Sequence, residues 1–251
     1  MNTRHIPVLL HETAALLNCR EGGTYVDATV GSGGHALHLL QQHPGIKMLI
    51  GIDRDEEAIG RAQKKLEPFS HKAAVLHGNF KELKTILNRA GIDKADGILF
   101  DLGVSSPQLD DPARGFSFSA EGPLDMRMDR NTPMDAKELL EQLSARDIED
   151  ILRSFGEERW ARRIARRIKE QQQQTPIETT TQLRDIVYRA IPARHAGKIH
   201  PATKTFQALR IAVNDELAAV ASGLDDAIEL LAPQGRLCAI SFHSLEDRIV
   251  K

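Results

Sequence analysis

The first hundred residues alternate short apolar runs with amphipathic segments, and this alternation limits the chain to one class of fold. Buried strands are expected over residues 24–30, 48–52, 73–77 and 97–102, with helices over 36–42, 56–66 and 80–90. Strands that alternate with helices at this spacing form a parallel sheet covered by helices on both faces. In such sheets, ligands bind beyond the carboxyl ends of the strands. We therefore expect an α/β fold with a binding site at that edge of the sheet.

The alternation stops after residue 102. Residues 103–134 are rich in Gly, Pro, Ser and Asp and show no helical period, which indicates a long loop. Helices are then expected at about 135–143, 145–154, 157–173, 180–190 and 203–231, followed by a fifth strand over 236–242. Trp160 shares a helical stripe with Ile164 and Ile168, so it is expected to pack in the core. This order predicts one discontinuous domain, residues 1–106 and 203–251, interrupted by a helical insertion over 107–202.

Composition narrows the class of protein. The chain has 251 residues, of which 41% are apolar, but no apolar run approaches the roughly 18 residues of a membrane span. The first residues contain no apolar signal core, so a cytoplasmic protein is expected. Cys19 and Cys238 form no CxxC pair, and the ten histidines show no HxH or HExxH spacing. A disulfide framework, a structural zinc site and a catalytic metal are therefore not expected.

Charge is distributed unevenly along the chain. Residues 153–210 contain 13 Lys or Arg and 5 Asp or Glu, whereas the remaining residues contain 20 basic and 30 acidic side chains. A basic block in an otherwise acidic chain indicates that one part of the molecule meets a polyanion. The alternative is that these residues form only a well-solvated helical face. Charge alone does not separate the two interpretations.

A glycine-rich loop follows the first expected strand. The run Gly31-Ser32-Gly33-Gly34-His35-Ala36 matches the GxGxxG/A pattern between a strand and a helix, which is typical of dinucleotide and S-adenosylmethionine sites. Its glycines let the backbone approach a ligand closely, and the start of the helix offers free N–H groups. Asp53 ends the second strand, where a carboxylate can accept hydrogen bonds from two ribose hydroxyls. The alternatives are structural: the glycines make only a tight turn, and Asp53 caps the next helix.

Two further positions favour S-adenosylmethionine over a dinucleotide. Asp27 lies four residues before Gly31, which gives the acid-led loop typical of methyltransferases, and its charge would repel a pyrophosphate. Asn79 and Phe80 follow the third strand, where an amide can meet the adenine edge and an aromatic ring can pack on it. Asn79 can equally cap the helix that begins near Phe80.

The fourth strand leads into a polar loop. Asp101 is followed by Leu102-Gly103-Val104-Ser105-Ser106-Pro107-Gln108-Leu109-Asp110-Asp111. Methyltransferases that act on exocyclic amines place an Asp- or Asn-led loop with proline at this position. The amine of cytosine or adenine is conjugated with its ring and is a poor nucleophile, and nearby carbonyl and carboxylate oxygens can direct its lone pair toward the methyl group. The loop lacks the usual Asn/Asp-Pro-Pro-aromatic sequence. Its position after the fourth strand, rather than its sequence, therefore indicates an amine methyltransferase.

Several long, irregular runs are not dictated by secondary structure. They cover residues 5–10 (HIPVLL), 30–35 (VGSGGH), 101–110 (DLGVSSPQLD), 114–118 (RGFSF), 122–129 (GPLDMRMD), 156–159 (GEER), 200–208 (HPATKTFQA) and 240–251 (ISFHSLEDRIVK). On these runs nearly the whole chain resembles the RsmH (MraW) family of bacterial methyltransferases. Members of that family use S-adenosylmethionine and act on cytosine N4 of 16S ribosomal RNA. They usually continue past the position of Lys251 with a further strand pair and a basic tail.

The resemblance implies a Rossmann-like class I methyltransferase fold with an inserted helical domain, and S-adenosylmethionine as cofactor. Cofactor contacts carried over by position fall on Gly33, Gly34, His35, Asp53, Phe80, Asp101 and Gln108. Asp101, with the backbone of Ser105, Ser106, Pro107 and Gln108, is the candidate for orienting the amine. The implied substrate is 16S ribosomal RNA within the small (30S) subunit, and a homodimer is left open.

The helical insertion is expected to recognise RNA. Its Arg and Lys residues, with Lys198, His200, Lys204 and Arg210, are candidates for phosphate contacts. The target base must be reached outside a stack, and Phe116, Phe118 and Phe242 are candidate stacking surfaces, although each can instead be a core residue. His243 follows the fifth strand and either lines the substrate pocket or is a structural histidine.

Three other functions compete with this interpretation. A DNA exocyclic-amine methyltransferase shares the same cofactor and chemistry. A nicotinamide dehydrogenase is disfavoured because Asp27 and the loop after Asp101 have no evident part in hydride transfer. A non-catalytic RNA-binding protein predicts an eroded cofactor loop, whereas the glycines and Asp53 are all present.

Overall fold

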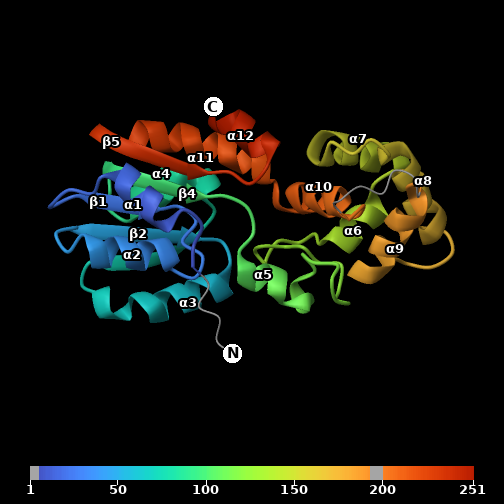
Figure 1. The fold of residues 1–251 in the computed structure, drawn as a ribbon, viewed down its shortest axis with the longest axis horizontal. Coiled ribbons are helices and arrows are strands. Elements are labelled where there is room, and N and C mark those ends of the chain that lie inside the picture. Colours follow the sequence, from blue (N-terminus) through green and yellow to red (C-terminus); the bar gives the residue numbers. More distant parts are fainter. Residues whose placement is uncertain (1–5, 193–199) are drawn as a thin grey trace. The chain divides into compact units, whose positions relative to one another are not determined.

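Residues 6–192 and 200–251 of the protein are described, from a computed structural model (Figure 1). His5, the first residue of the first resemblance run, lies outside these ranges. The chain divides into two compact units, Met1–Gly103 with Leu217–Lys251, and Val104–Glu216. The second unit is longer than the insertion expected over 107–202, because helix α10 (Thr203–Asn214) packs its apolar side chains into that unit's core.

The first unit is built on a five-stranded parallel sheet. Its strands are β1 (Thr24–Asp27), β2 (Met48–Asp53), β3 (Ala73–His77), β4 (Ala95–Asp101) and β5 (Leu231–Ile240). They lie in the order β3-β2-β1-β4-β5, and every neighbouring pair is parallel. Because the order reverses beside β1, the carboxyl ends of β1 and β4 flank a crevice of the kind that binds ligands in such sheets. The predicted α/β class is confirmed.

Helices cover both faces of this sheet. They are α1 (Leu10–Leu17), α2 (Gly34–Gln42), α3 (Glu56–Leu66), α4 (Leu83–Arg89), α11 (Glu216–Leu230) and α12 (Ser244–Val250), with 3₁₀ turns η1 (Glu67–Phe69) and η2 (Phe80–Glu82). Side chains alternate along each strand: Ile98 and Phe100 join the apolar cluster with α4 and α11, whereas Leu99 joins the cluster with α1, α2 and α3. The sheet is therefore buried on both sides, as a parallel sheet requires.

The second unit is helical. It contains α5 (Ser106–Asp110), η3 (Pro112–Arg114), α6 (Ala136–Gln142), α7 (Ala145–Gly156), α8 (Ala161–Gln172), α9 (Thr180–Ala190) and α10. Its core includes Ile148 and Leu152 of α7, Ile164 and Ile168 of α8, and Leu209 of α10. Trp160 packs against this core as expected. This core is separate from the apolar clusters of the sheet.

Residues 103–134 form a long connection that carries the short turns α5 and η3, which the sequence pattern did not predict. The remainder lacks regular structure, so its backbone polar groups need side-chain partners. Asn214 supplies them, accepting from Met128 N at 2.8 Å and donating to Met126 O at 2.7 Å. The guanidinium of buried Arg114 donates to the carbonyls of Arg127 and Met128 at 3.1 and 3.0 Å. Two buried polar side chains thus fix the path of this loop.

Several expected elements have different bounds, and two of them differ most. The single helix expected over 203–231 is two helices, α10 and α11, because Asp215 adopts a left-handed conformation (φ 50°) between them. Strand β5 begins at Leu231 rather than residue 236, and its pairing with β4 continues through an irregularity between Ala95 and Gly97. Gln234 has φ 66° in this stretch, as expected for a residue in a bulge.

Within the described part of the chain, no helix is long and apolar enough to cross a membrane.

Candidate active site

Most of the expected cofactor residues gather at the carboxyl edge of the sheet. Asp53 and Asp101 end β2 and β4, and Phe80 follows β3. Gly33, Gly34 and His35 lie where β1 passes into α2. Gln108 belongs to the second unit. The order of the strands thus brings together residues that are up to 68 positions apart in the sequence.

The glycines of this loop serve two different purposes. Gly31 adopts φ 52°, and a Cβ there would meet only the carbonyl oxygen of Thr29, at 3.8 Å, so the space in front of it is open. At Gly33 (φ 75°) a Cβ would lie 3.3 Å from Ala62 Cα in α3, and at Gly34 it would lie 2.4 Å from Pro7 Cγ. Gly33 and Gly34 are therefore required by packing, and Gly31 is the glycine that leaves room for a ligand.

Asp53 holds the glycine loop in place. Its Oδ2 accepts a hydrogen bond from Gly31 N at 2.8 Å, and its Oδ1 accepts one from Asp55 N at 2.9 Å. The N-cap of α3 is Asp55, which accepts from Glu57 N and Ala58 N, so the capping role considered for Asp53 is wrong. Burial raises the pKa of Asp53, although the two backbone N–H groups act in the opposite direction.

The side chains of Asn79 and Phe80 both make contacts within the protein. The Asn79 side chain accepts from Lys81 N at 3.0 Å, which makes it the N-cap of η2, one of the two roles considered for it. The Phe80 ring meets Phe100 edge to face at 5.5 Å between centroids and leaves no room for a side chain at Gly223 in α11. Phe80 remains half-buried, so part of the residue stays accessible beyond β3.

Three titratable side chains converge where β1, β4 and α2 meet. The Nε2 atom of His35 lies 3.6 Å from Oδ2 of Asp101, and the Asp101 backbone N–H donates to Thr29 Oγ1 at 2.6 Å. Asp27, at the end of β1, is 1% exposed and accepts from Thr29 N at 3.3 Å. Burial raises the pKa of Asp27 to about 7, although His35 and the Thr29 N–H act in the opposite direction.

The pKa of Asp27 leads to a prediction for stability. The Asp27 carboxyl group has a pKa near 7 in the folded protein, whereas its ordinary value is 3.8. At a pH between these two pKa values, it therefore binds more protons in the folded protein than in the unfolded protein. Stability is therefore lost as pH rises from about 4 to 7. We expect Asp27→Asn, which keeps an oxygen for the Thr29 N–H, to remove this loss and to be more stable than wild type at pH 8 by a few kcal/mol. Urea denaturation at pH 5, 7 and 8 measures the difference. A constant difference across this range would contradict the prediction.

The loop after Asp101 enters the second unit. Ser105 is the N-cap of α5, Ser106 and Pro107 form the first positions of that helix, and Gln108 is buried. The Gln108 Oε1 atom accepts from Ser105 N at 2.9 Å, so this side chain caps α5. The periodicity of the sequence gave no indication of this cap, although a Ser–x–x–Gln run is a recognisable capping pattern.

The expected stacking residues have different environments. Phe116 is 6% exposed and lies in the core of the second unit, so it is not available for stacking on a base. Phe118 packs between Phe206 and His200, at 4.8 and 4.7 Å between ring centroids. Phe242 is 56% exposed. His243 is the N-cap of α12, where Nδ1 accepts from Glu246 N at 3.4 Å and Nε2 lies 3.2 Å from Glu246 Oε1, which favours the structural role.

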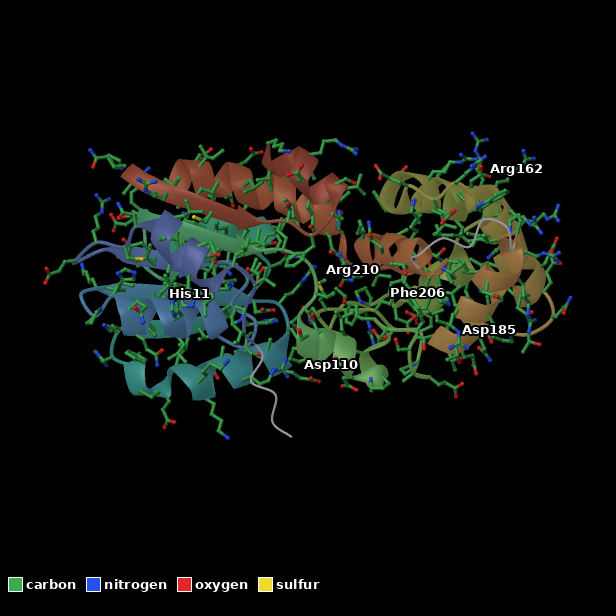
Figure 2. All side chains as sticks on the ribbon, in the orientation of Figure 1. His11, Asp110, Arg162, Asp185, Phe206 and Arg210 are labelled. Atoms are coloured by element: carbon green, nitrogen blue, oxygen red, sulfur yellow. The ribbon has the colours of Figure 1, made fainter. Side chains whose placement is uncertain are left out.

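The expected phosphate-binding cations fall into two groups. Arg162, Arg163, Arg166 and Arg167 are exposed along α8, and Arg162 extends outward from the second unit in Figure 2. Arg210, however, forms a largely buried bidentate pair with Glu216, with both N–O distances at 2.9 Å, which disfavours its expected phosphate contact. Lys204 donates to the carbonyl of Glu157 at 2.9 Å. Lys198 lies outside the described residues.

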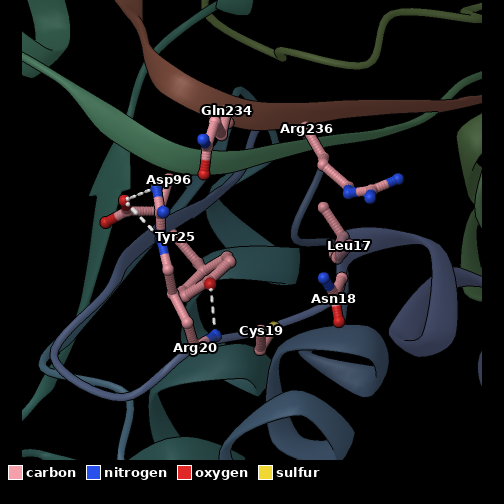
Figure 3. Close-up of a pocket in the computed structure, with 9 residues that line it drawn as sticks. Leu17, Asn18, Cys19, Arg20, Tyr25, Asp96, Gln234 and Arg236 are labelled. Carbon is pink, nitrogen blue, oxygen red and sulfur yellow. Dashed lines mark hydrogen bonds and ion pairs between the residues drawn. The ribbon is translucent and has the colours of Figure 1, made fainter.

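A cavity of about 610 Å³ lies at the opposite, amino edge of the sheet (Figure 3). The residues that line it include Cys19, Arg20, Tyr25, Asp96 and Arg236. Arg20 pairs with Asp96 inside it, and burial raises the pKa of the Cys19 thiol to about 11. A thiol of this kind is unreactive at neutral pH. The cavity is thus separate from the carboxyl edge, and the sequence pattern did not indicate it.

In the described ranges, no three His, Cys, Asp or Glu side chains are grouped so that they could hold a metal ion.

The chain is similar to known proteins along nearly its whole length. The MraW methylase family matches residues 2–251. A protein of Symbiobacterium thermophilum named "Ribosomal RNA small subunit methyltransferase H" is 50% identical over 100% of this chain and 79% of its own length. Proteins of the same name from Trichlorobacter lovleyi and Syntrophobacter fumaroxidans are 52% and 48% identical, each over 98% of this chain and over 79% and 78% of their own lengths.

Proposed function

The chain belongs to the MraW methylase family, and we propose that it transfers a methyl group from S-adenosylmethionine to the N4 amine of a cytidine in the decoding region of 16S ribosomal RNA. The sheet is that of a Rossmann-like class I methyltransferase. The observation that carries the proposal is the carboxyl edge of this sheet, which combines an open glycine loop with Asp27, Asp53 and Asp101. We place the protein in the cytoplasm, where its substrate is the small ribosomal subunit.

The residues of this edge fit the cofactor. The open space at Gly31 admits a ligand close to the backbone, and Asp53 has lone pairs left for ribose hydroxyls after its two backbone contacts. Phe80 is half-exposed where adenine would pack. When bound, the cofactor supplies a methyl group on a sulfonium sulfur. Gly33, Gly34, His35, Asp101 and Gln108 are the further cofactor contacts that the resemblance implies.

The acceptor amine needs orientation more than it needs a base. The lone pair of cytosine N4 is delocalised into the ring, and the nitrogen becomes acidic only after it has attacked. Asp101, whose side chain is 28% exposed, is placed to accept a hydrogen bond from the amine. The backbone of Ser105–Gln108 is the second candidate for this role. Both act by holding the lone pair toward the methyl carbon.

We assign recognition of the RNA to the second unit. The exposed arginines of α8 supply positive charge, and two of them, Arg166 and Arg167, pair with Glu170 at 3.1 Å. The target cytidine must leave its stack to reach the carboxyl edge. Phe118 and Phe242 remain candidates for stacking on it.

Removal of two of these arginines should reduce the salt dependence of RNA binding. Each phosphate contact contributes about 0.7–0.9 to the slope of log affinity against log salt concentration. We therefore expect the Arg162→Ala, Arg163→Ala double variant to lower that slope by about 1.5 for 16S ribosomal RNA. The matched control is Lys64→Ala, Lys65→Ala on α3, which removes the same charge from the first unit. A slope unchanged in the arginine variant, or lowered equally by both, would remove α8 from the RNA interface.

The proposed acceptor is tested by competition. Undermethylated small ribosomal subunits and duplex DNA are offered together to the enzyme with labelled S-adenosylmethionine. We expect the label in the ribosomal RNA, and label in the DNA would support the DNA amine methyltransferase instead. Cofactor binding without transfer to either acceptor would favour a non-catalytic RNA-binding protein.

A further inference from the structure

A buried histidine lies behind the acid that is proposed to orient the amine. His35 is in the first turn of α2 and is 6% exposed, whereas the Asp101 side chain is 28% exposed. The two side chains are 3.6 Å apart at Nε2 and Oδ2. Asp101 thus lies nearer the surface, and His35 lies beneath it.

Two polar atoms of this pair lack a hydrogen bond in the described structure. They are Nε2 of His35 and Oδ1 of Asp101, both of which are fully buried. A buried polar atom without a partner is costly, and each one in a folded protein calls for a physical explanation. At 3.6 Å the pair is too long for a direct hydrogen bond, and a shift of less than 1 Å would form one. The Nε2 atom of His35 is therefore close to Asp101, and among the described residues it makes no other hydrogen bond that would hold it in place.

The surrounding charges favour a cationic imidazole. Burial opposes protonation of His35, but the interactions with Asp101 and Asp27 outweigh it and raise its pKa. Asp53 lies near Asp27 at the next strand end, and its charge acts on Asp27. On the helical side, the charge of His35 acts on His38 of α2, whose ring meets that of His11 of α1 at 5.0 Å. Acids at the strand ends and a histidine of its own helix thus interact with His35.

We propose that His35 is a positioning residue, which donates a hydrogen bond to Asp101 and so fixes the carboxylate in the orientation that accepts the cytidine amine. This role rests on the proposed function. It is separate from the cofactor contact that the family resemblance places at His35, because it concerns the side chain and acts through Asp101. Asp27 supports it by attracting positive charge to the imidazole.

The test compares His35→Ala with His35→Gln, which retains a donor that does not titrate. We expect His35→Ala to lower kcat by about 100-fold, the order of loss that a misplaced reacting group produces, with KM for S-adenosylmethionine changed less than about threefold. His35→Gln should recover much of the rate. Thermal unfolding of both variants shows whether the fold is kept.

The pH profile of kcat separates positioning from a structural role. In wild type, kcat should fall modestly as pH rises through the pKa of His35, because the charge-assisted hydrogen bond to Asp101 becomes a weaker neutral one, and this fall should be absent in His35→Gln. Asp27→Asn should move the fall to lower pH. A folded His35→Ala variant with wild-type kcat, or a pH profile that His35→Gln leaves unchanged, would overturn the inference. Loss of cofactor affinity equal to the loss of kcat would also overturn it. Absence of methyl transfer by wild type would instead contradict the proposed function.

Discussion

Replacement of Asp101 by alanine is expected to lower kcat by about 10²–10³-fold, the loss typical of removing one group that stabilises a transition state. The carboxylate is the partly exposed acid at the end of β4, and the amine it orients is a poor nucleophile. The backbone of Asp101 is anchored independently, through its N–H to Thr29 Oγ1 at 2.6 Å, so the truncation should leave the strand in place. Single-turnover methylation of undermethylated small subunits, with cofactor at saturation, measures the effect.

Cofactor binding is measured separately for the same variant. Calorimetric titration with S-adenosylmethionine shows how much of the loss comes from affinity. Asp93→Ala is the matched control, because Asp93 is an exposed acid just before the same strand. If Asp101→Ala weakened cofactor binding alone and bound substrate turned over at the wild-type rate, Asp101 would be a cofactor residue only.

The second large effect is expected at Asp53. Asp53→Ala removes the acceptors for Gly31 N and Asp55 N, and charge-assisted hydrogen bonds contribute about 1.5–3 kcal/mol each. The glycine loop then loses its anchor, and the ribose loses its carboxylate. We expect affinity for S-adenosylmethionine to fall by about 100-fold or more, since each 1.4 kcal/mol corresponds to about tenfold. Calorimetry again provides the measurement.

The conservative variant distinguishes the two parts of that effect. Asp53→Asn retains one acceptor oxygen, so it should bind the cofactor with an affinity between those of wild type and Asp53→Ala. The exposed Asp93→Ala control should bind like wild type. An Asp53→Ala protein that is folded and binds the cofactor within threefold of wild type would show that Asp53 does not contribute to the site.

The sequence predicted the sheet well because each strand carries its own local pattern. The helix expected over 56–66 is α3 residue for residue, and the strand expected over 73–77 is β3. These segments combine a clear hydrophobic period with capping or turn residues at both ends. Asp53 and Asp101 could be placed at one edge for the same reason, since parallel strands bring their carboxyl ends together.

Features that depend on partners outside the local periodicity were harder to predict. Arg210 was expected on phosphate, but its partner Glu216 lies beyond a left-handed residue that breaks the helix, and no local period marks that break. Phe116 was open between a stacking surface and a core residue, and the structure places it in the core, among helices far along the chain. The contact of His35 with Asp101 likewise joins positions 66 residues apart.

The capping roles form a third group. Asn79 was open between a ligand contact and a helix cap, and Asp53 between a ribose contact and a cap. The sequence leaves such cases open because Asn and Asp serve both purposes at the same place, between a strand end and a helix start. The structure separates them through the hydrogen bonds: Asn79 caps η2, whereas Asp55 rather than Asp53 caps α3.

Identification of the methylated nucleoside tests the proposed methyl transfer to cytidine N4. Undermethylated small subunits are incubated with the protein and S-adenosylmethionine carrying a tritiated methyl group, and the 16S ribosomal RNA is digested to nucleosides. We expect the label to elute as N4-methylcytidine, and Asp101→Ala to reduce it greatly. Label in any other nucleoside, or no label from a protein that binds the cofactor tightly, would contradict the proposed transfer.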